Sequence, residues 1–212
     1  IGTLNKNTIP SMFLAGKKAN ALGHIVLLDP VGAGASRLRT DTANRLMQEV
    51  RFDAVRGNIS EIKTLCTGSG STNGVDADAV DAVTEANLDN GVQLVKTFAA
   101  QTGCIIAVTG AIDLVSDGER CWCIRNGRAE MSRITGTGCQ LSALMTAFLV
   151  ANPDRKLDAA AAAVCMMGLA GEIGWANMQP GDGNSTYRNR IIDAIFNMTG
   201  DALEEGAKYE LR

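Results

Sequence analysis

The sequence predicts an α/β fold in which a mostly parallel sheet is covered by helices on both faces. Two short segments, 25–28 and 104–108, are continuously apolar, which is typical of strands buried on both faces. Segments whose apolar residues recur at helical spacing alternate with these strands along the chain. Such alternation favours parallel strands joined by helical crossovers. With 212 residues, the chain is long enough for a full core, and we expect 1–212 to form a single domain.

The first half of the chain is predicted to contain three helices and two strands. In chain order these are a helix at 8–21, a strand at 25–28, a helix at 40–50 capped by Thr40 or Asp41, a strand at 53–55, and a helix that starts after Arg56-Gly57-Asn58. The first strand ends at Asp29-Pro30, and a glycine-rich loop follows it. The segment from Gly68 to Gly74 has the composition of a linker, and we expect a loop within the domain there.

The second half continues the alternation and adds a small antiparallel unit. The expected elements are a helix at about 79–101, a strand at 104–108, a β-meander at 112–116, 119–125 and 128–133, a helix after the glycines near 137, an alanine-rich helix at about 158–178, a helix at about 187–199, and a charged end at 201–212. Turn signals at Ser116-Asp117-Gly118 and Asn126-Gly127 predict the meander.

The segment Ile134-Thr135-Gly136-Thr137-Gly138-Cys139-Gln140 is the strongest candidate for a binding loop. It leads into a helix whose apolar side chains recur at helical spacing: Leu141, Leu144, Met145, Phe148 and Leu149. Glycines before a helix let free backbone N–H groups surround an anion, and Cys139 lies in the first turn, where negative charge is favoured. The motif matches neither a lysine-bearing P-loop nor a dinucleotide fingerprint. Taken alone, it fits equally well a glycine turn that caps a helix, with Cys139 as a small buried apolar residue.

Polar residues follow the strands at one edge of the predicted sheet. Asp29 follows the first strand, Arg56 to Glu61 follow the second, Thr109-Gly110 follow the third, and the 135–139 loop precedes its helix. In open α/β sheets, ligands bind at the carboxyl ends of the strands. Each feature alone has a structural explanation as a turn, a helix-terminal charge or a strand end. Their convergence at one edge indicates a functional site.

Charge and hydropathy argue against two classes of partner. The net charge is −3 and no basic cluster is present, which argues against nucleic acid. We find no apolar segment that approaches a membrane span and no secretory leader, so no membrane association is expected. The chain opens without an initiator Met, as if inside a strand, and we expect it to lack an N-terminal segment.

The cysteines and the single histidine limit the possible chemistry. Six cysteines without C-x-x-C spacing indicate reduced thiols in a cytoplasmic protein. His24 precedes the first strand and would lie about 17 Å from the functional edge, which argues against a Cys–His hydrolase. Cys121 and Cys123 form at most a weak zinc site. The aspartates and Glu61 suit Mg²⁺ instead.

Four motifs together resemble the hydroxyethylthiazole kinase family, which belongs to the ribokinase-like fold and acts in thiamine salvage. They are Asp29-Pro30-Val31-Gly32-Ala33-Gly34, Arg56-Gly57-Asn58-Ile59-Ser60-Glu61, Val108-Thr109-Gly110 and Thr135-Gly136-Thr137-Gly138-Cys139. Their occurrence in this order is specific, and the resemblance extends from Ile1 to about Asn197. It implies ATP- and Mg²⁺-dependent phosphorylation of the hydroxyl of 4-methyl-5-(2-hydroxyethyl)thiazole.

The resemblance also implies residue roles and an assembly. Arg56 and Thr109 would contact ATP, the backbone of Thr137 and Gly138 would face its phosphates, and Gly136 would lie against the thiazole. Glu61, Asn58 and Asp29 would form the metal and phosphate cluster, and Cys139 would be the catalytic base where most ribokinase-like enzymes carry Asp. Family members are homotrimers with shared active sites, and we expect the small-residue helix face of Gly168, Gly171 and Gly174 to permit close packing of subunits.

Two other functions are also compatible with the sequence. One is a dehydratase of the same fold that uses ATP or ADP to repair hydrated NAD(P)H; it would normally show Asp in place of Cys139. The other is a non-catalytic nucleotide-binding remnant, because family members have an opening segment that supplies part of the thiazole pocket.

Overall fold

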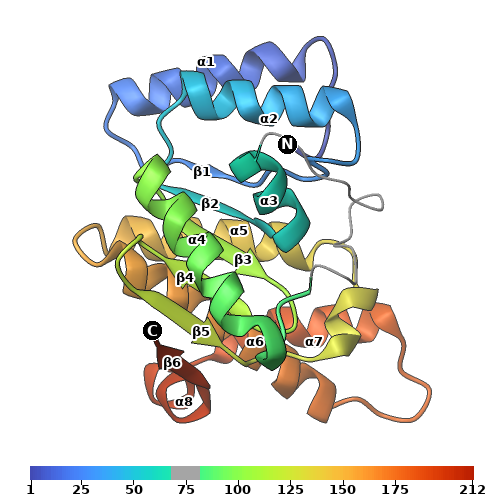
Figure 1. Cartoon of the computed structure of the whole chain (residues 1–212). Coiled ribbons are helices and arrows are strands. Elements are labelled where there is room, and N and C mark those ends of the chain that lie inside the picture. Colours follow the sequence, from blue (N-terminus) through green and yellow to red (C-terminus); the bar gives the residue numbers. More distant parts are fainter. Residues whose placement is uncertain (68–81) are drawn as a thin grey trace.

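The computed structural model describes residues 1–67 and 82–212, in which six strands form one sheet in the order β1-β2-β3-β4-β5-β6 (Figure 1). The strands are β1 (Leu27–Leu28), β2 (Ala54–Asn58), β3 (Ile105–Thr109), β4 (Asp113–Ser116), β5 (Cys121–Ile124) and β6 (Tyr209–Leu211). β1, β2 and β3 are parallel, whereas β4, β5 and β6 each pair antiparallel to the preceding strand. The α/β prediction is confirmed, but the sheet is mixed, because short hairpins return β4 and β5 directly beside their neighbours.

Helices cover both faces of the sheet, as predicted. They are α1 (Thr8–Ala21), α2 (Arg37–Glu49), α3 (Ile59–Thr67), α4 (Leu88–Thr102), α5 (Thr137–Ala151), α6 (Lys156–Ala176), α7 (Asn184–Asn197) and α8 (Gly200–Gly206). One core cluster joins α1 to α4 with the sheet and includes Phe13, Leu46 and Val95. A second cluster joins α5, α6 and α7 with the other face and includes Met145 and Val164. Figure 1 shows these two layers, with α3 and α4 in front of the sheet and α5 to α7 behind it.

Helix starts differ from the predictions where a capping residue was missed. The Ser36 side chain accepts a hydrogen bond from the N–H of Arg39, so α2 begins at residue 37, and neither Thr40 nor Asp41 is its cap. A short 3₁₀ helix at Glu85–Asn87 precedes α4, which therefore begins at Leu88. The start of the helix predicted at 79–101 and the Gly68–Gly74 segment lie outside the described residues.

The prediction of a third meander strand at 128–133 is wrong. Ala129–Arg133 forms a 3₁₀ helix, and the position beside β5 is occupied by β6, where Cys123 is opposite Glu210. The charged end at 201–212 thus contains α8 and an edge strand. Exposed charges are a common protection of edge strands, and here they hid the strand from hydropathy patterns.

Helix α6 corrects two expectations from sequence. It is 21 residues long and apolar enough to cross a membrane by length and composition, but 72% of its apolar window is buried, so it is the central helix of the second layer. Its glycine face serves packing within the chain. A Cβ at Gly168 would lie 2.7 Å from the backbone of Asn126, one at Gly171 would overlap the Met131 sulfur, and one at Gly174 would lie 3.2 Å from Ile191. These glycines therefore offer no surface for subunit packing.

Candidate functional site

The parallel strands β1, β2 and β3 deliver polar side chains to one edge of the sheet, and Arg56 lies at the centre of them. It lies within β2, which extends three residues beyond its predicted end, and its side chain is only 13% exposed. Its guanidinium donates from Nη1 to Asp29 Oδ2 at 3.2 Å and from Nη2 to Thr109 Oγ1 at 2.9 Å. One arginine thus connects the carboxyl ends of all three parallel strands.

The two carboxylate oxygens of Asp29 differ in their hydrogen bonds. Oδ2 accepts the bond from Arg56 and a second one, at 2.7 Å, from the hydroxyl of Ser142 on α5. Oδ1 is buried and has no partner among the described residues. Because a buried carboxylate oxygen without a partner is costly, Oδ1 fits a cation or a donor group of a ligand.

The turn before α5 forms an opening for an anion. Gly136 has φ +98°, a left-handed conformation that favours glycine, and it lies at the N-cap of the helix. Gln140 donates the first helical hydrogen bond, to Gly136 O at 3.0 Å. The N–H groups of Thr137, Gly138 and Cys139 precede it and have no acceptor within the helix. The explanation of Cys139 as a buried apolar residue is wrong, because its side chain is exposed.

Because Gly138 has no side chain, the guanidinium of Arg56 can lie directly beside it. A Cβ on Gly138 would be 2.7 Å from Nη1 of Arg56 and 3.1 Å from Nη2. The guanidinium therefore packs directly against the helix start, and its positive charge adds to the partial charge of the N–H groups there.

Glu61 and Asn58 form a reciprocal cap at the start of α3. Asn58 Oδ1 accepts the N–H of Glu61 at 2.8 Å, and Glu61 Oε2 accepts the N–H of Asn58 at 2.9 Å. Glu61 Oε1 also accepts the N–H of Gly32 at 2.8 Å, which ties the glycine loop to α3. Glu61 is only 4% exposed, and burial raises its pKa, with the two N–H donors acting against that effect.

The amino group of Ile1 lies near these acidic residues and donates to the Asp29 carbonyl at 2.8 Å. Burial lowers the pKa of the amino group of Ile1, while the charges of Asp29, Cys139 and Glu61 raise it. Asp29 also raises the pKa of Glu61, whereas Arg56 lowers it.

Asp113 was not among the predicted site residues, although it lies next to this cluster. It begins β4, and its Oδ1 accepts the N–H of Gly110 at 2.7 Å, which fixes the turn after Thr109. Burial raises the pKa of Asp113 to about 7, while the Gly110 N–H and the charge of Arg56 act against burial. An Asp three residues after a strand-ending Thr-Gly is the sequence signal that could have identified it.

We expect Asp113→Asn to change the pH dependence of stability. Because the native pKa is raised, the neutral form stabilises the fold fully below about pH 4, and that stability is lost as pH rises through 7. Asn keeps an acceptor for Gly110 but does not ionise. Relative to the parent, the unfolding free energy of the variant should increase by about 4 kcal/mol between pH 4 and pH 8, which is about 1.4 kcal/mol for each unit of the raised pKa.

Denaturant titrations of the parent and the variant across this pH range test the expectation. Asp117→Asn is the matched control, because the pKa of Asp117 is lowered: hydrogen bonds from Arg120 and Glu119 outweigh burial. The stability that Asp117 contributes is lost only as pH falls below about 4, so between pH 4 and pH 8 the curve of this variant should run parallel to that of the parent. Parallel curves for Asp113→Asn and the parent would contradict the prediction.

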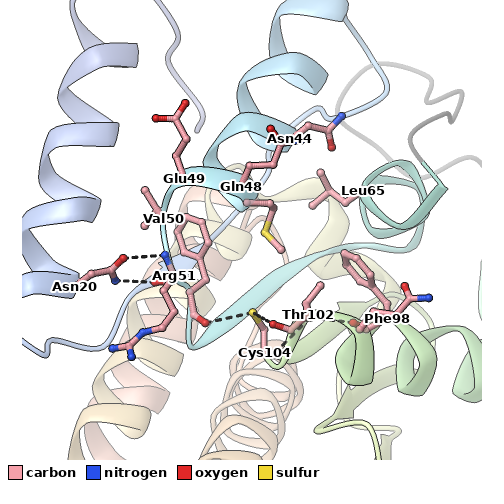
Figure 2. Close-up of a pocket in the computed structure, with 13 residues that line it drawn as sticks. Asn20, Asn44, Gln48, Glu49, Val50, Arg51, Leu65, Phe98, Thr102 and Cys104 are labelled. Atoms are coloured by element: carbon pink, nitrogen blue, oxygen red, sulfur yellow. Dashed lines mark hydrogen bonds between the residues drawn. The ribbon is translucent and has the colours of Figure 1, made fainter.

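A large cavity in the described part of the chain lies away from this site. It has a volume of about 860 Å³ and is lined by residues at the opposite end of the strands, among them Phe52 before β2 and Cys104 before β3. Figure 2 shows Cys104 and Thr102 on one side and Asn20, bonded to the backbone of Arg51, on another. The cavity is thus separated from Arg56 by the length of the parallel strands.

The remaining cysteines and His24 do not join the site. All six cysteines are free, as predicted, and Cys121 and Cys123 are buried in the core on one side of the sheet. Within residues 1–67 and 82–212, no group of three or more His, Cys, Asp or Glu side chains could by itself hold a metal ion. His24 is exposed in the turn before β1.

Comparisons with known proteins return one family. Residues 1–201 match the hydroxyethylthiazole kinase family. The chain is 53% identical to the hydroxyethylthiazole kinase of Clostridium acetobutylicum over 99% of its own length and 77% of the relative's. It is 42% identical to that of Ruminiclostridium cellulolyticum, covering 98% of this chain and 74% of the relative.

Solved structures extend the comparison to the fold. The structure of the hydroxyethylthiazole kinase protein from Pyrococcus horikoshii has a TM-score of 0.84 and 29% identity, and the match covers 100% of this chain and 74% of that one. The Staphylococcus aureus pyridoxal kinase in complex with AMP-PCP and pyridoxal has a TM-score of 0.60 and 19% identity, over 99% and 70% of the two chains. The second match shows that the fold is shared with another small-molecule kinase.

Proposed function

The chain belongs to the hydroxyethylthiazole kinase family, and from that premise we propose how its residues transfer phosphate from ATP to the hydroxyl of 4-methyl-5-(2-hydroxyethyl)thiazole in thiamine salvage. The enzyme is a kinase of the ribokinase-like fold. The observation that supports the proposed site is the contact of Arg56 with Asp29, Thr109 and Gly138 at the carboxyl ends of the parallel strands. Both helical layers pack on one sheet, and a single kinase domain at 1–212 is part of the proposal.

We propose that Asp29, Glu61 and Asn58 hold Mg²⁺ together with the phosphates of ATP. Mg²⁺ in proteins is commonly bound by one or two carboxylates, with water and phosphate oxygens as the other ligands. The Oδ1 of Asp29, which is buried and has no partner within residues 1–67 and 82–212, fits such a ligand set. Glu61 accepts two N–H bonds and, as a carboxylate, retains further lone pairs. When bound, the ion would neutralise charge on the phosphates and polarise them.

The remaining residues orient the reactants and move one proton. The N–H groups of Thr137, Gly138 and Cys139 would donate to the γ-phosphate, and Arg56 and Thr109 would contact ATP. Gly136 would lie against the thiazole. As the substrate oxygen bonds to the γ-phosphorus and the bond to the β–γ bridging oxygen breaks, the hydroxyl proton would pass to the Cys139 thiolate, and ADP would leave.

An assay of ADP formation tests the function against its alternatives. The kinase should convert ATP to ADP only with the thiazole alcohol, and the phosphorylated thiazole should appear in equal amount. Turnover with hydrated NADH instead would indicate the dehydratase. Nucleotide binding without turnover on either substrate would indicate a non-catalytic remnant.

We expect Gly138→Ala to lower kcat/KM for ATP about 100-fold, the cost of a displacement of about 1 Å in a catalytic site. The added methyl group would force Arg56 away from Asp29 and Thr109. Gly200→Ala is the matched control, because a Cβ there meets nothing within 4 Å. If both variants are as active as the parent, Arg56 does not depend on the space at Gly138.

We also propose a cytoplasmic homotrimer with active sites shared between subunits. Support comes from exposed apolar side chains on α7: Phe196 is 87% exposed and Ile192 is 45% exposed, and an interface would bury such groups. Light scattering at micromolar concentration should give three times the mass of the chain, and a monomer would contradict the proposal.

A further inference from the structure

Ser142 makes a contact that its local sequence does not require. A serine inside a helix commonly bonds the carbonyl four residues earlier, as Thr146 does here toward Ser142 O at 2.8 Å. The hydroxyl of Ser142 instead donates to Asp29 Oδ2 at 2.7 Å, across 113 residues of sequence. The helix that presents Cys139 is thereby tied to the end of β1.

This hydrogen bond decides which oxygen of Asp29 remains available. Oδ2 is occupied by Ser142 at 2.7 Å and by Arg56 at 3.2 Å, while Oδ1 is buried and unpartnered among the described residues. With Arg56 alone, the longer contact would hold the carboxylate less firmly, and rotation about its last bond would exchange the two oxygens. The serine hydroxyl is a directional donor that opposes this exchange.

Ser142 also lies three residues after Cys139 on α5, so the two share one helix face. The same hydroxyl therefore links the carboxylate to the turn of helix that carries the proposed base. A change in the angle of the α5 start relative to β1 would move both groups together.

We infer that Ser142 is a positioning residue for phosphoryl transfer: its hydroxyl fixes the Asp29 carboxylate so that Oδ1 faces the cation and the phosphates. The role of Ser142 in turnover rests on the proposed function. The restraint of the Asp29 carboxylate by Ser142 rests only on the hydrogen bond between them. Partners that orient ligating carboxylates typically contribute 10–100-fold to metal affinity or activity.

Cation binding and turnover of Ser142→Ala, Ser142→Thr and the matched control Thr146→Val test the inference. Thr146→Val removes a hydroxyl from the same helix one turn away. Binding is measured by the electron paramagnetic resonance signal of free Mn²⁺, titrated in the presence of AMP-PCP. Turnover is measured as the Mg²⁺ concentration for half-maximal rate, with kcat and KM for the thiazole determined separately.

We expect Ser142→Ala to weaken Mn²⁺ binding and to raise the Mg²⁺ requirement, each by about 10–100-fold, with KM for the thiazole nearly unchanged. Ser142→Thr keeps the hydroxyl and should restore both values, and Thr146→Val should match the parent. Ser142→Cys, a weaker donor of similar size, should be intermediate, and it replaces the alanine variant if that variant does not fold.

Equal Mn²⁺ binding by Ser142→Ala and Thr146→Val would overturn the inference and leave Ser142 as a tie between helix and strand. If the parent does not phosphorylate the thiazole but Ser142→Ala still weakens Mn²⁺ binding, the proposed function fails and the positioning of Asp29 stands.

Discussion

Replacing Cys139 by alanine is expected to lower kcat by about 10²–10⁴-fold, the usual contribution of a general base. The thiolate would take the proton of the thiazole hydroxyl, and alanine cannot accept it. Cys139→Asp should retain activity, because a carboxylate can accept that proton. Cys139→Ser should resemble alanine, because a neutral hydroxyl is a poor base at neutral pH. The measurement is kcat at saturating ATP.

The structure makes this series interpretable. Cys139 is the only exposed cysteine of the six, so its replacement removes little packing and should not unfold the protein. Cys66→Ala, on α3 and half-buried, is the matched control and should keep the parent kcat. If Ser and Ala are mild and Asp is the most harmful, negative charge beside the phosphate is the dominant effect and Cys139 is not the base.

The fold could be predicted wherever burial leaves a pattern. The strands at 25–28 and 104–108 are apolar throughout because helices cover both of their faces, and the predicted segments overlap β1 and β3. β2 was predicted too short because Arg56-Gly57-Asn58 resembles a turn. It continues as a strand because residues 56–58 pair with β3 in parallel, so that Asn58 lies opposite Thr109. β6 is an exposed edge strand with alternating charges, and its sequence resembles a tail.

The site was predictable to the extent that its residues lie in local motifs. Asp29, Arg56 and Thr109 follow or end parallel strands, and strand order alone brings them together. Ser142 had no such signal, since a serine inside a helix is usually bonded to its own backbone, and its partner is fixed only by the packing of α5 against β1. The choice between a cap and a metal ligand for Glu61 also cannot be made from sequence, because one carboxylate can serve as both.

Glu61→Gln tests both roles at once, and we expect turnover to fall at least about 100-fold with little change in nucleotide affinity. Glutamine is neutral and would weaken a Mg²⁺ site. It also places an NH₂ group against the N–H of Gly32 or Asn58, which both donate to the present carboxylate. The unfavourable contact should lower the unfolding free energy by about 1–3 kcal/mol.

Glu172→Gln separates the loss of stability from the loss of turnover. Glu172 lies near the C-terminal end of α6 and also accepts hydrogen bonds, from the N–H of Gly127 at 2.9 Å and from Lys208 at 2.7 Å. The variant should lose similar stability and keep the parent kcat. Denaturant titration, kcat and ATP affinity are measured for both variants under identical conditions. If Glu61→Gln loses stability but turns over ATP at the rate of Glu172→Gln, the carboxylate of Glu61 is only the cap of α3, and the cation is held by other groups.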